Sequence, residues 1–220
     1  MIVELIDHMG SDLSVVNSAR TSFGKESKEF SEKDARLVKY LAREKHLLPF
    51  RHPQITLRLK IPIFVARQLG KHQTGMSWSE ESRRYIDSPP EFYWPEVWRK
   101  RAENVKQGSS EETVVPVWFD GYGSFKGSNS PGDFEDVVLT QYNRLLEQGV
   151  APEQARMILP QNMYTTCIWT GSLLSFVHVI HERTTAGTQK ETRDVALQIK
   201  DILTPLYPIS IDALLNGETN

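Results

Sequence analysis

The sequence predicts a fold that mixes helices and strands within one domain. Its 220 residues suffice for one domain with a sizeable core, or for one domain that carries an insertion. Residues 54–61 alternate apolar and polar side chains, which is the pattern of a half-buried strand. Residues 34–45 and 189–203 instead space their apolar side chains as amphipathic helices do. We therefore expect one domain over residues 1–220 that contains both kinds of element.

The N-terminal part is expected to begin with a strand and two helices. Val3–His8 is short and apolar enough for a strand, and Ser11–Arg20 is predicted to be a helix capped by a polar side chain at its start. Ser31-Glu-Lys-Asp34 resembles a capping box, with aspartate in the usual glutamate place. It leads into the helix expected over Asp34–Lys45. The alternating strand Gln54–Ile61 follows and precedes a polar stretch.

The second half is predicted to be mainly helical after an irregular insertion around residues 87–130. Prolines and aromatic residues are scattered there among Gly and Ser. These aromatic side chains either anchor a loop to the core or form a stacking platform for a pterin or a base. Residues 121–130 are expected to be loop. The expected helices are Trp94–Ala102, Asp133–Gln148, a short helix from Pro152, the long apolar helix Met163–Arg183, and Gln189–Leu203.

Composition excludes several classes of protein. The net charge of -2 gives no general attraction to nucleic acid or to an anionic membrane, so neither is expected as a partner. No apolar run approaches the roughly 18 residues of a membrane span, and the N-terminus lacks the features of a signal peptide. One cysteine excludes an internal disulfide and fits a reducing cytoplasm. His178 and His181 lack a third ligand, so no metal site is expected.

The polar stretch Arg67–Tyr85 is the strongest candidate for a binding site. Pro62 suits the first turn of a helix to about His72, which would place Gln68 and Lys71 on one face. From Ser77 an extended backbone would turn three polar residues to one side: Glu80, Ser82 and Arg84. A cation, a hydroxyl and a forked guanidinium are groups that bind phosphate. The alternative is a solvated helix end followed by a polar loop.

The same stretch resembles the signature of the flavin-dependent thymidylate synthases, the family called ThyX. Their pattern is Gln-x-x-Arg-His-Arg followed by Glu-x-Ser-x-Arg-Tyr. This chain has Gln68-x-x-Lys71-His72-Gln73, then eight residues to Ser82 within Glu80-x-Ser82-x-Arg84-Tyr85. The second half matches fully, whereas the first half replaces both arginines and gains one residue. The resemblance continues from about Glu4 to Pro208, with poor agreement after Tyr85.

This resemblance implies an α/β (α+β) subunit with a central sheet flanked by helices. It also implies a homotetramer that binds FAD and nucleotide where subunits meet. The family converts dUMP to dTMP, with methylenetetrahydrofolate as carbon donor and NADPH-reduced FAD as hydride source. Two alternatives stay open: a divergent flavoenzyme for another one-carbon transfer to a pyrimidine nucleotide, motivated by Lys71-His72-Gln73, and a non-catalytic nucleotide-binding module.

The resemblance also implies roles for individual residues. Arg183 holds the position of the arginine that activates the pyrimidine; otherwise it is a helix-end cation that complements the dipole. The implied dUMP-binding residues are Gln68, Lys71, Glu80, Ser82, Arg84, Arg156 and Arg183. The implied FAD-binding residues are Ser22, His46, Leu48, Lys71, His72, Gln73, Glu80, Ser172 and His178.

Overall fold

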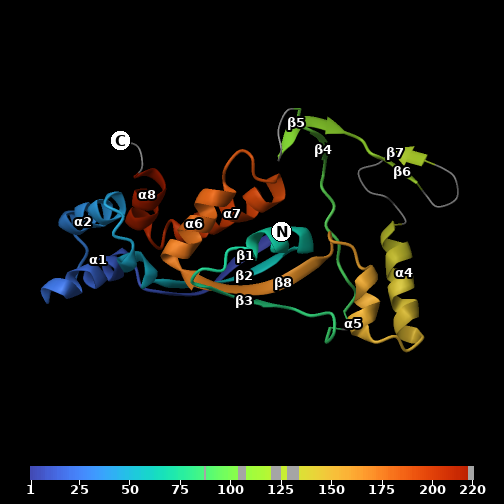
Figure 1. Ribbon diagram of the computed structural model, residues 1–220, viewed down its shortest axis with the longest axis horizontal. Helices are drawn as coiled ribbons and strands as arrows, with labels where there is room; N and C mark the ends of the chain where they lie inside the picture. Colours follow the sequence, from blue (N-terminus) through green and yellow to red (C-terminus); the bar gives the residue numbers. More distant parts are fainter. Residues whose placement is uncertain (87, 104–107, 120–124, 128–133, 218–220) are drawn as a thin grey trace. The chain divides into compact units, whose positions relative to one another are not determined.

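The computed structural model describes residues 1–86, 88–103, 108–119, 125–127 and 134–217 (Figure 1). The chain forms two compact units. The first unit comprises Met1–Leu59, Leu69–Ser79 and Cys167–Asn220, and the second comprises Lys60–Gln68 and Glu80–Thr166. Within the described ranges, no helix combines the length and the apolar character that a membrane crossing requires.

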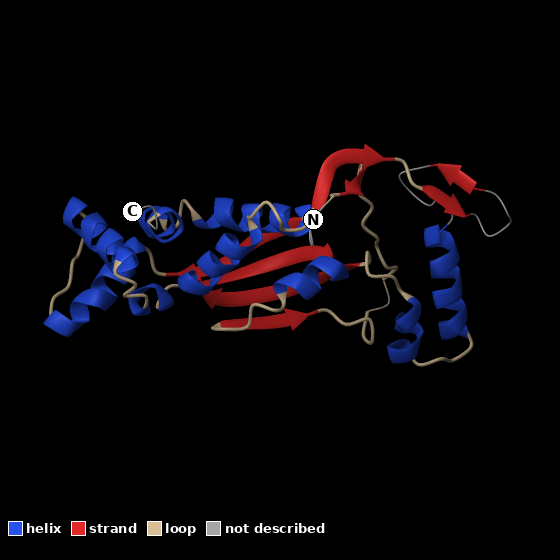
Figure 2. Ribbon diagram, turned by 45° about the horizontal axis from the view of Figure 1, so that its top comes forward, coloured by secondary structure: helices blue, strands red, loops and turns tan. Residues whose placement is uncertain are grey.

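The main sheet has four strands in the order β1-β2-β8-β3. Figure 1 labels these strands, and Figure 2 draws them in red. These strands are β1 (Ile2–Met9), β2 (Gln54–Pro62), β3 (Met76–Glu80) and β8 (Tyr164–Ser172). The predicted inward residues of β2 are fully buried: Ile55, Leu57, Leu59 and Ile61. Their alternation with polar residues therefore predicted both the strand and its buried side.

The first two helices of the first unit begin beside the capping residues that the sequence predicts. These helices are α1 (Asp12–Arg20), α2 (Glu32–Arg43), α6 (Leu173–Arg183), α7 (Lys190–Leu203) and α8 (Pro208–Asn216). The Ser11 hydroxyl accepts a hydrogen bond from the backbone N–H of Leu13, and Asp34 accepts one from the N–H of Ser31 at 2.8 Å. Helices α6 and α7 lie side by side, as do α2 and α8 (Figure 1).

The predicted long helix over Met163–Arg183 is wrong in its first half, because residues 164–172 form strand β8. Thr165, Cys167 and Trp169 are buried and alternate with half-buried residues, as in β2. β-branched and aromatic side chains favour such a strand over a helix. The helix starts only at Leu173, where the Ser172 hydroxyl caps it by accepting from the N–H of Ser175.

The second unit contains most of α3 (Ile63–Leu69), two antiparallel strand pairs and three helical segments. The pairs are β4 (Trp98–Arg101) with β5 (Ser109–Val114), and β6 (Val117–Phe119) with β7 (Phe125–Gly127). The helical segments are α4 (Phe134–Glu147), α5 (Pro152–Ala155) and the 3₁₀ turn η3 (Arg156–Ile158). The loop expected over residues 121–130 lies outside the described residues, except for 125–127, which belong to β7.

The insertion around residues 87–130 is more regular than predicted. The expected helix Trp94–Ala102 is wrong, since Trp98 pairs with Val114 across the β4–β5 ladder. The Trp118 ring meets the Trp98 ring at 5.4 Å and the Trp94 ring at 6.2 Å, both edge-on. These three rings therefore pack against one another within the insertion. Whether the aromatic residues anchor the insertion to the core or form a stacking platform stays a prediction.

Candidate functional site

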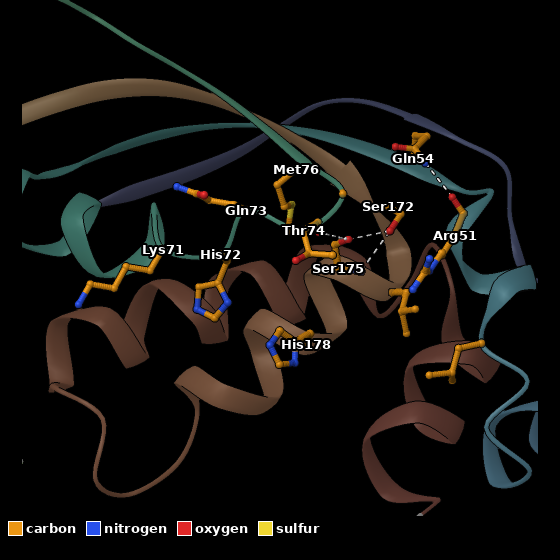
Figure 3. Close-up of a pocket in the computed structure, with 13 residues that line it drawn as sticks. Arg51, Gln54, Lys71, His72, Gln73, Thr74, Met76, Ser172, Ser175 and His178 are labelled. Carbon is orange, nitrogen blue, oxygen red and sulfur yellow. Dashed lines mark hydrogen bonds between the residues drawn. The ribbon is translucent and has the colours of Figure 1, made fainter.

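A cavity of about 690 Å³ lies in the first unit (Figure 3). This volume is within the range of small-molecule and cofactor sites. Its lining includes five of the residues predicted to bind FAD: Lys71, His72, Gln73, Ser172 and His178. Sequence reasoning missed other lining residues, among them Arg51, Thr74 and Ser175. No local pattern marks these three, because they meet only through the fold.

The turn after α3 is held against the start of α6. The Ser175 hydroxyl donates to the carbonyl of Thr74 at 3.0 Å and shares a hydrogen bond with the Ser172 hydroxyl at 2.8 Å. Gly75 has φ +69°, and a Cβ there would lie 2.9 Å from the Ser175 oxygen. Glycine therefore permits both the left-handed turn and the close approach. The helix predicted to reach His72 ends earlier, at Leu69.

His72 and Arg183 meet beside this cavity. The Arg183 Nε–H donates to His72 Nε2 at 2.9 Å. A guanidinium stays protonated and can only donate, so His72 must accept through a neutral ring with its proton on Nδ1. Burial, the Arg183 charge and His178 together lower the pKa of His72 to about 4. The rings of His72 and His178 lie edge to face at 5.6 Å (Figure 3).

A second group of predicted residues meets in the second unit around the Ser82 hydroxyl. Arg84 Nε lies 3.2 Å from this oxygen, and an Arg156 terminal nitrogen lies 3.4 Å from it. The extended segment predicted through Arg84 is wrong: β3 ends at Glu80, and the Tyr85 N–H donates to the Ser82 carbonyl at 2.9 Å. The turn, rather than strand alternation, therefore brings Ser82 and Arg84 together.

A smaller cavity of about 360 Å³ lies in the same unit. Glu80 and Arg156 line it, and Glu80 accepts a hydrogen bond from the Thr165 hydroxyl at 2.9 Å. Arg83, which sequence reasoning did not select, also lines it and is 8% exposed. Its guanidinium donates to the backbone carbonyls of Ser88 and Pro89.

The other predicted site residues line neither cavity. Ser22 is exposed, Leu48 is 67% exposed, and the exposed His46 ring packs edge-on against Tyr40. Gln68 lies in α3, in the second unit. Lys71 and Arg183 belong to the first unit, so the predicted dUMP-binding residues are distributed over both units. Across the described ranges, no group of three or more His, Cys, Asp or Glu residues is placed to hold a metal ion.

Comparison with known proteins defines the class to which this fold and these residues belong. The family model described as "Thymidylate synthase complementing protein" matches residues 4–209, so the chain belongs to that family. Proteins named "Flavin-dependent thymidylate synthase" are among its relatives. One from Thermus thermophilus is 37% identical, over 94% of this chain and 73% of its own length. Another, from Kosmotoga olearia, is 36% identical, over 97% of this chain and 90% of its own length.

A solved structure supports the same conclusion about the fold. The UMP/dUMP methylase PolB from Streptomyces cacaoi, bound with 5-Br dUMP, aligns with a TM-score of 0.80 and 31% identity. The alignment covers 98% of this chain and 94% of PolB. The family resemblance and the mixed helix-and-sheet fold inferred from the sequence are both confirmed.

Proposed function

We propose that this protein is a flavin-dependent thymidylate synthase that methylates dUMP to dTMP. FAD is the cofactor, methylenetetrahydrofolate the carbon donor and NADPH the reductant. The observation that carries the proposal is the family match over residues 4–209, which includes both the His72 segment and Arg183. The lowered pKa of His72 adds support, because perturbed titration is common at functional sites.

The 690 Å³ cavity has the chemistry that FAD requires. Leu47, Met76 and Leu174 offer apolar surface to the flavin rings, whereas Arg51 and Lys71 offer positive charge to the pyrophosphate. The first turn of α6 also lines the cavity, and a helix N-terminus favours an anion. When bound, the flavin supplies the hydride, and the protein supplies position and charge.

Arg183 is proposed to activate the pyrimidine. A guanidinium drawing electron density toward the N3–O4 edge makes C5 of uracil more electron-rich, and its fork matches a planar acceptor edge. The alternative of a cysteine nucleophile finds no support, since Cys167 is the one cysteine in the sequence and is 1% exposed. Its thiol instead lies 3.8 Å from the Leu59 carbonyl.

The nucleotide phosphate is proposed to bind Ser82, Arg84 and Arg156. Both arginines are exposed and already contact the same hydroxyl, so two cations and a donor converge within one unit. Glu80, Gln68 and Lys71 complete the proposed nucleotide set. We further propose a homotetramer in the cytoplasm, with sites where subunits meet; light scattering would measure its mass.

Anaerobic turnover tests the proposed function directly. Protein incubated with FAD, dUMP, NADPH and methylenetetrahydrofolate should form dTMP, and omission of any one reactant should abolish it. FAD titration at low salt should show saturable binding. Absence of dTMP from FAD-loaded protein would refute the proposal.

A second candidate activity is methylation of UMP. The observation that favours it is the 31% identity and TM-score of 0.80 with a protein named as a UMP/dUMP methylase. Parallel assays with UMP and dUMP, analysed for each methylated product, separate the two candidates. The larger kcat/KM identifies the preferred nucleotide.

A further inference from the structure

The contact between His72 and Arg183 joins two segments that lie 111 residues apart in the sequence. His72 follows α3, where its backbone N–H donates to the Leu69 carbonyl at 3.0 Å. Arg183 is the last residue of α6. The His72 ring also packs edge-to-face against His178, which precedes Arg183 on α6. The ring is therefore fixed by its own turn and by the helix that carries Arg183.

We propose that His72 is a positioning residue that orients the guanidinium of Arg183 for the pyrimidine. The inference rests on the proposed function and assigns to His72 a role beyond contact with the flavin. Arginine has a long side chain with several rotatable bonds, so an unanchored guanidinium samples many orientations. A hydrogen bond at Nε fixes the plane of the group, and a bidentate contact to a planar acceptor must then use the two terminal nitrogens.

A neutral imidazole is suited to this task because it orients the guanidinium without offsetting its charge. A carboxylate in the same place would also accept from Nε, but its negative charge would weaken the field that polarises the pyrimidine. His72 can act only while it is neutral, because a protonated ring donates from both nitrogens. Its half-buried position and the adjacent Arg183 charge keep it neutral at physiological pH.

Three variants separate positioning from a merely structural role. His72→Met fills much of the space but leaves only a weak thioether acceptor in place of the imidazole nitrogen. We expect kcat of FAD-saturated protein to fall about 10²-fold, the scale of a small misplacement of a catalytic group. The dissociation constant of dUMP should change little, and saturation with FAD removes any effect of the lost ring on flavin affinity from the measured kcat. His72→Gln restores an acceptor near the position of Nε2 and should recover most of kcat. His181→Gln is the control on α6, the helix that carries Arg183. His181 is exposed and contacts Glu182, so this variant should keep the wild-type kcat.

A second measurement needs no turnover. In protein with ¹⁵N-labelled histidine, His72 is assigned as the signal lost in His72→Gln. We expect a neutral ring with the proton on Nδ1, and we expect Arg183→Met to change its nitrogen shifts and raise its pKa. A His72 signal with the proton on Nε2, or wild-type kcat in folded His72→Met, would overturn the inference. If His72→Met does not fold, the tautomer of His72 in the wild-type spectrum decides whether the inference holds.

The two readouts also keep the inference apart from the proposed function. Wild-type protein that forms no dTMP refutes the function, and the histidine spectrum then still decides whether His72 holds Arg183. Wild-type protein that forms dTMP, together with an active His72→Met variant, refutes only the positioning role.

Discussion

Arg183 in the first unit and Arg84 in the second unit are two cations with different surroundings. Arg183 is half-buried, and its Nε donates to an imidazole whose ring is held by α6. Arg84 is exposed, stacks over the Tyr85 ring at 5.0 Å and contacts a hydroxyl, whose proton can rotate. The first arrangement fixes a charge in one orientation, which suits the proposed activation of the pyrimidine. The second leaves the guanidinium adjustable, which suits the proposed binding of a phosphate.

The largest effect is expected from Arg183→Lys, which retains the charge but loses the fork. Turnover should fall about 10²-fold or more, the scale of losing one oriented electrostatic donor. Fold and FAD binding should be retained, as checked by circular dichroism and flavin titration. If Arg183 only complemented the helix dipole, lysine would preserve activity. Near-normal dTMP formation at saturating dUMP would therefore show that the orientation of Arg183, like that of Arg84, is not critical for turnover.

Arg84→Ala tests the other side of the comparison. Loss of one charge-assisted phosphate contact should raise the dUMP dissociation constant about ten- to a hundred-fold, with a smaller effect on kcat. Isothermal titration with dUMP measures the first quantity, and saturation kinetics the second. Unchanged dUMP affinity would remove Arg84 from the nucleotide site.

Acidification should disturb the Arg183 contact. Burial first, and then Arg183 and His178, lower the pKa of His72 from 6.5 to about 4, while Glu182 opposes them. The unfolded chain therefore binds more protons than the folded protein between these values. The stability from neutral His72 is full above about pH 6.5 and is lost as the pH falls toward 4. Urea unfolding measures the free energy of unfolding at pH 7 and at pH 5. Between these two pH values this free energy should fall more for the wild type than for His72→Gln.

Gln73→Arg should tighten FAD binding, because it adds a cation at the lining of the 690 Å³ cavity. The gain should be less than about tenfold, since exposed charges are screened by solvent and salt. Titrations at low and high salt provide the measurement, and the gain should shrink at high salt. If the gain in FAD affinity did not depend on salt, it would not come from the charge of the added arginine.

The smallest effect is expected from Cys167→Ser, which lies outside both cation sites. The serine hydroxyl can donate to the Leu59 carbonyl that the thiol faces at 3.8 Å. Turnover should therefore stay substantially intact in folded, FAD-loaded protein. Complete loss of activity would revive a thiol mechanism and contradict the role of Arg183.

Strands β2 and β8 differ in how well the sequence predicts them. The strands β2 and β8 have nearly the same burial pattern and each leads directly into a helix. β2 was predicted because Arg58 and Lys60 separate its buried residues. In β8, Thr166, Ile168 and Thr170 occupy the half-buried positions, so the alternation is hidden and the segment was predicted as helix.

The candidate site was predictable in part. Five predicted FAD-binding residues line one cavity, three of them from the Lys71-His72-Gln73 motif. Ser82 contacts Arg84, as the sequence predicts, and also contacts Arg156, whereas the predicted convergence of Gln68 and Lys71 with them stays a prediction. The contact of His72 with Arg183 left no trace in the sequence, because nothing local links residues 111 positions apart. The buried Arg83 likewise stands at a variable place in the motif, where its partners are backbone carbonyls.

The burial of Cys167 also makes the protein convenient for site-specific spectroscopy. A thiol-reactive dye reacts through the exposed thiolate, and the native thiol is 1% exposed. A cysteine introduced at the exposed Gln73 would therefore be labelled against almost no background. A fluorophore there would lie at the lining of the cavity, so that quenching by an incoming flavin would report cofactor binding in real time.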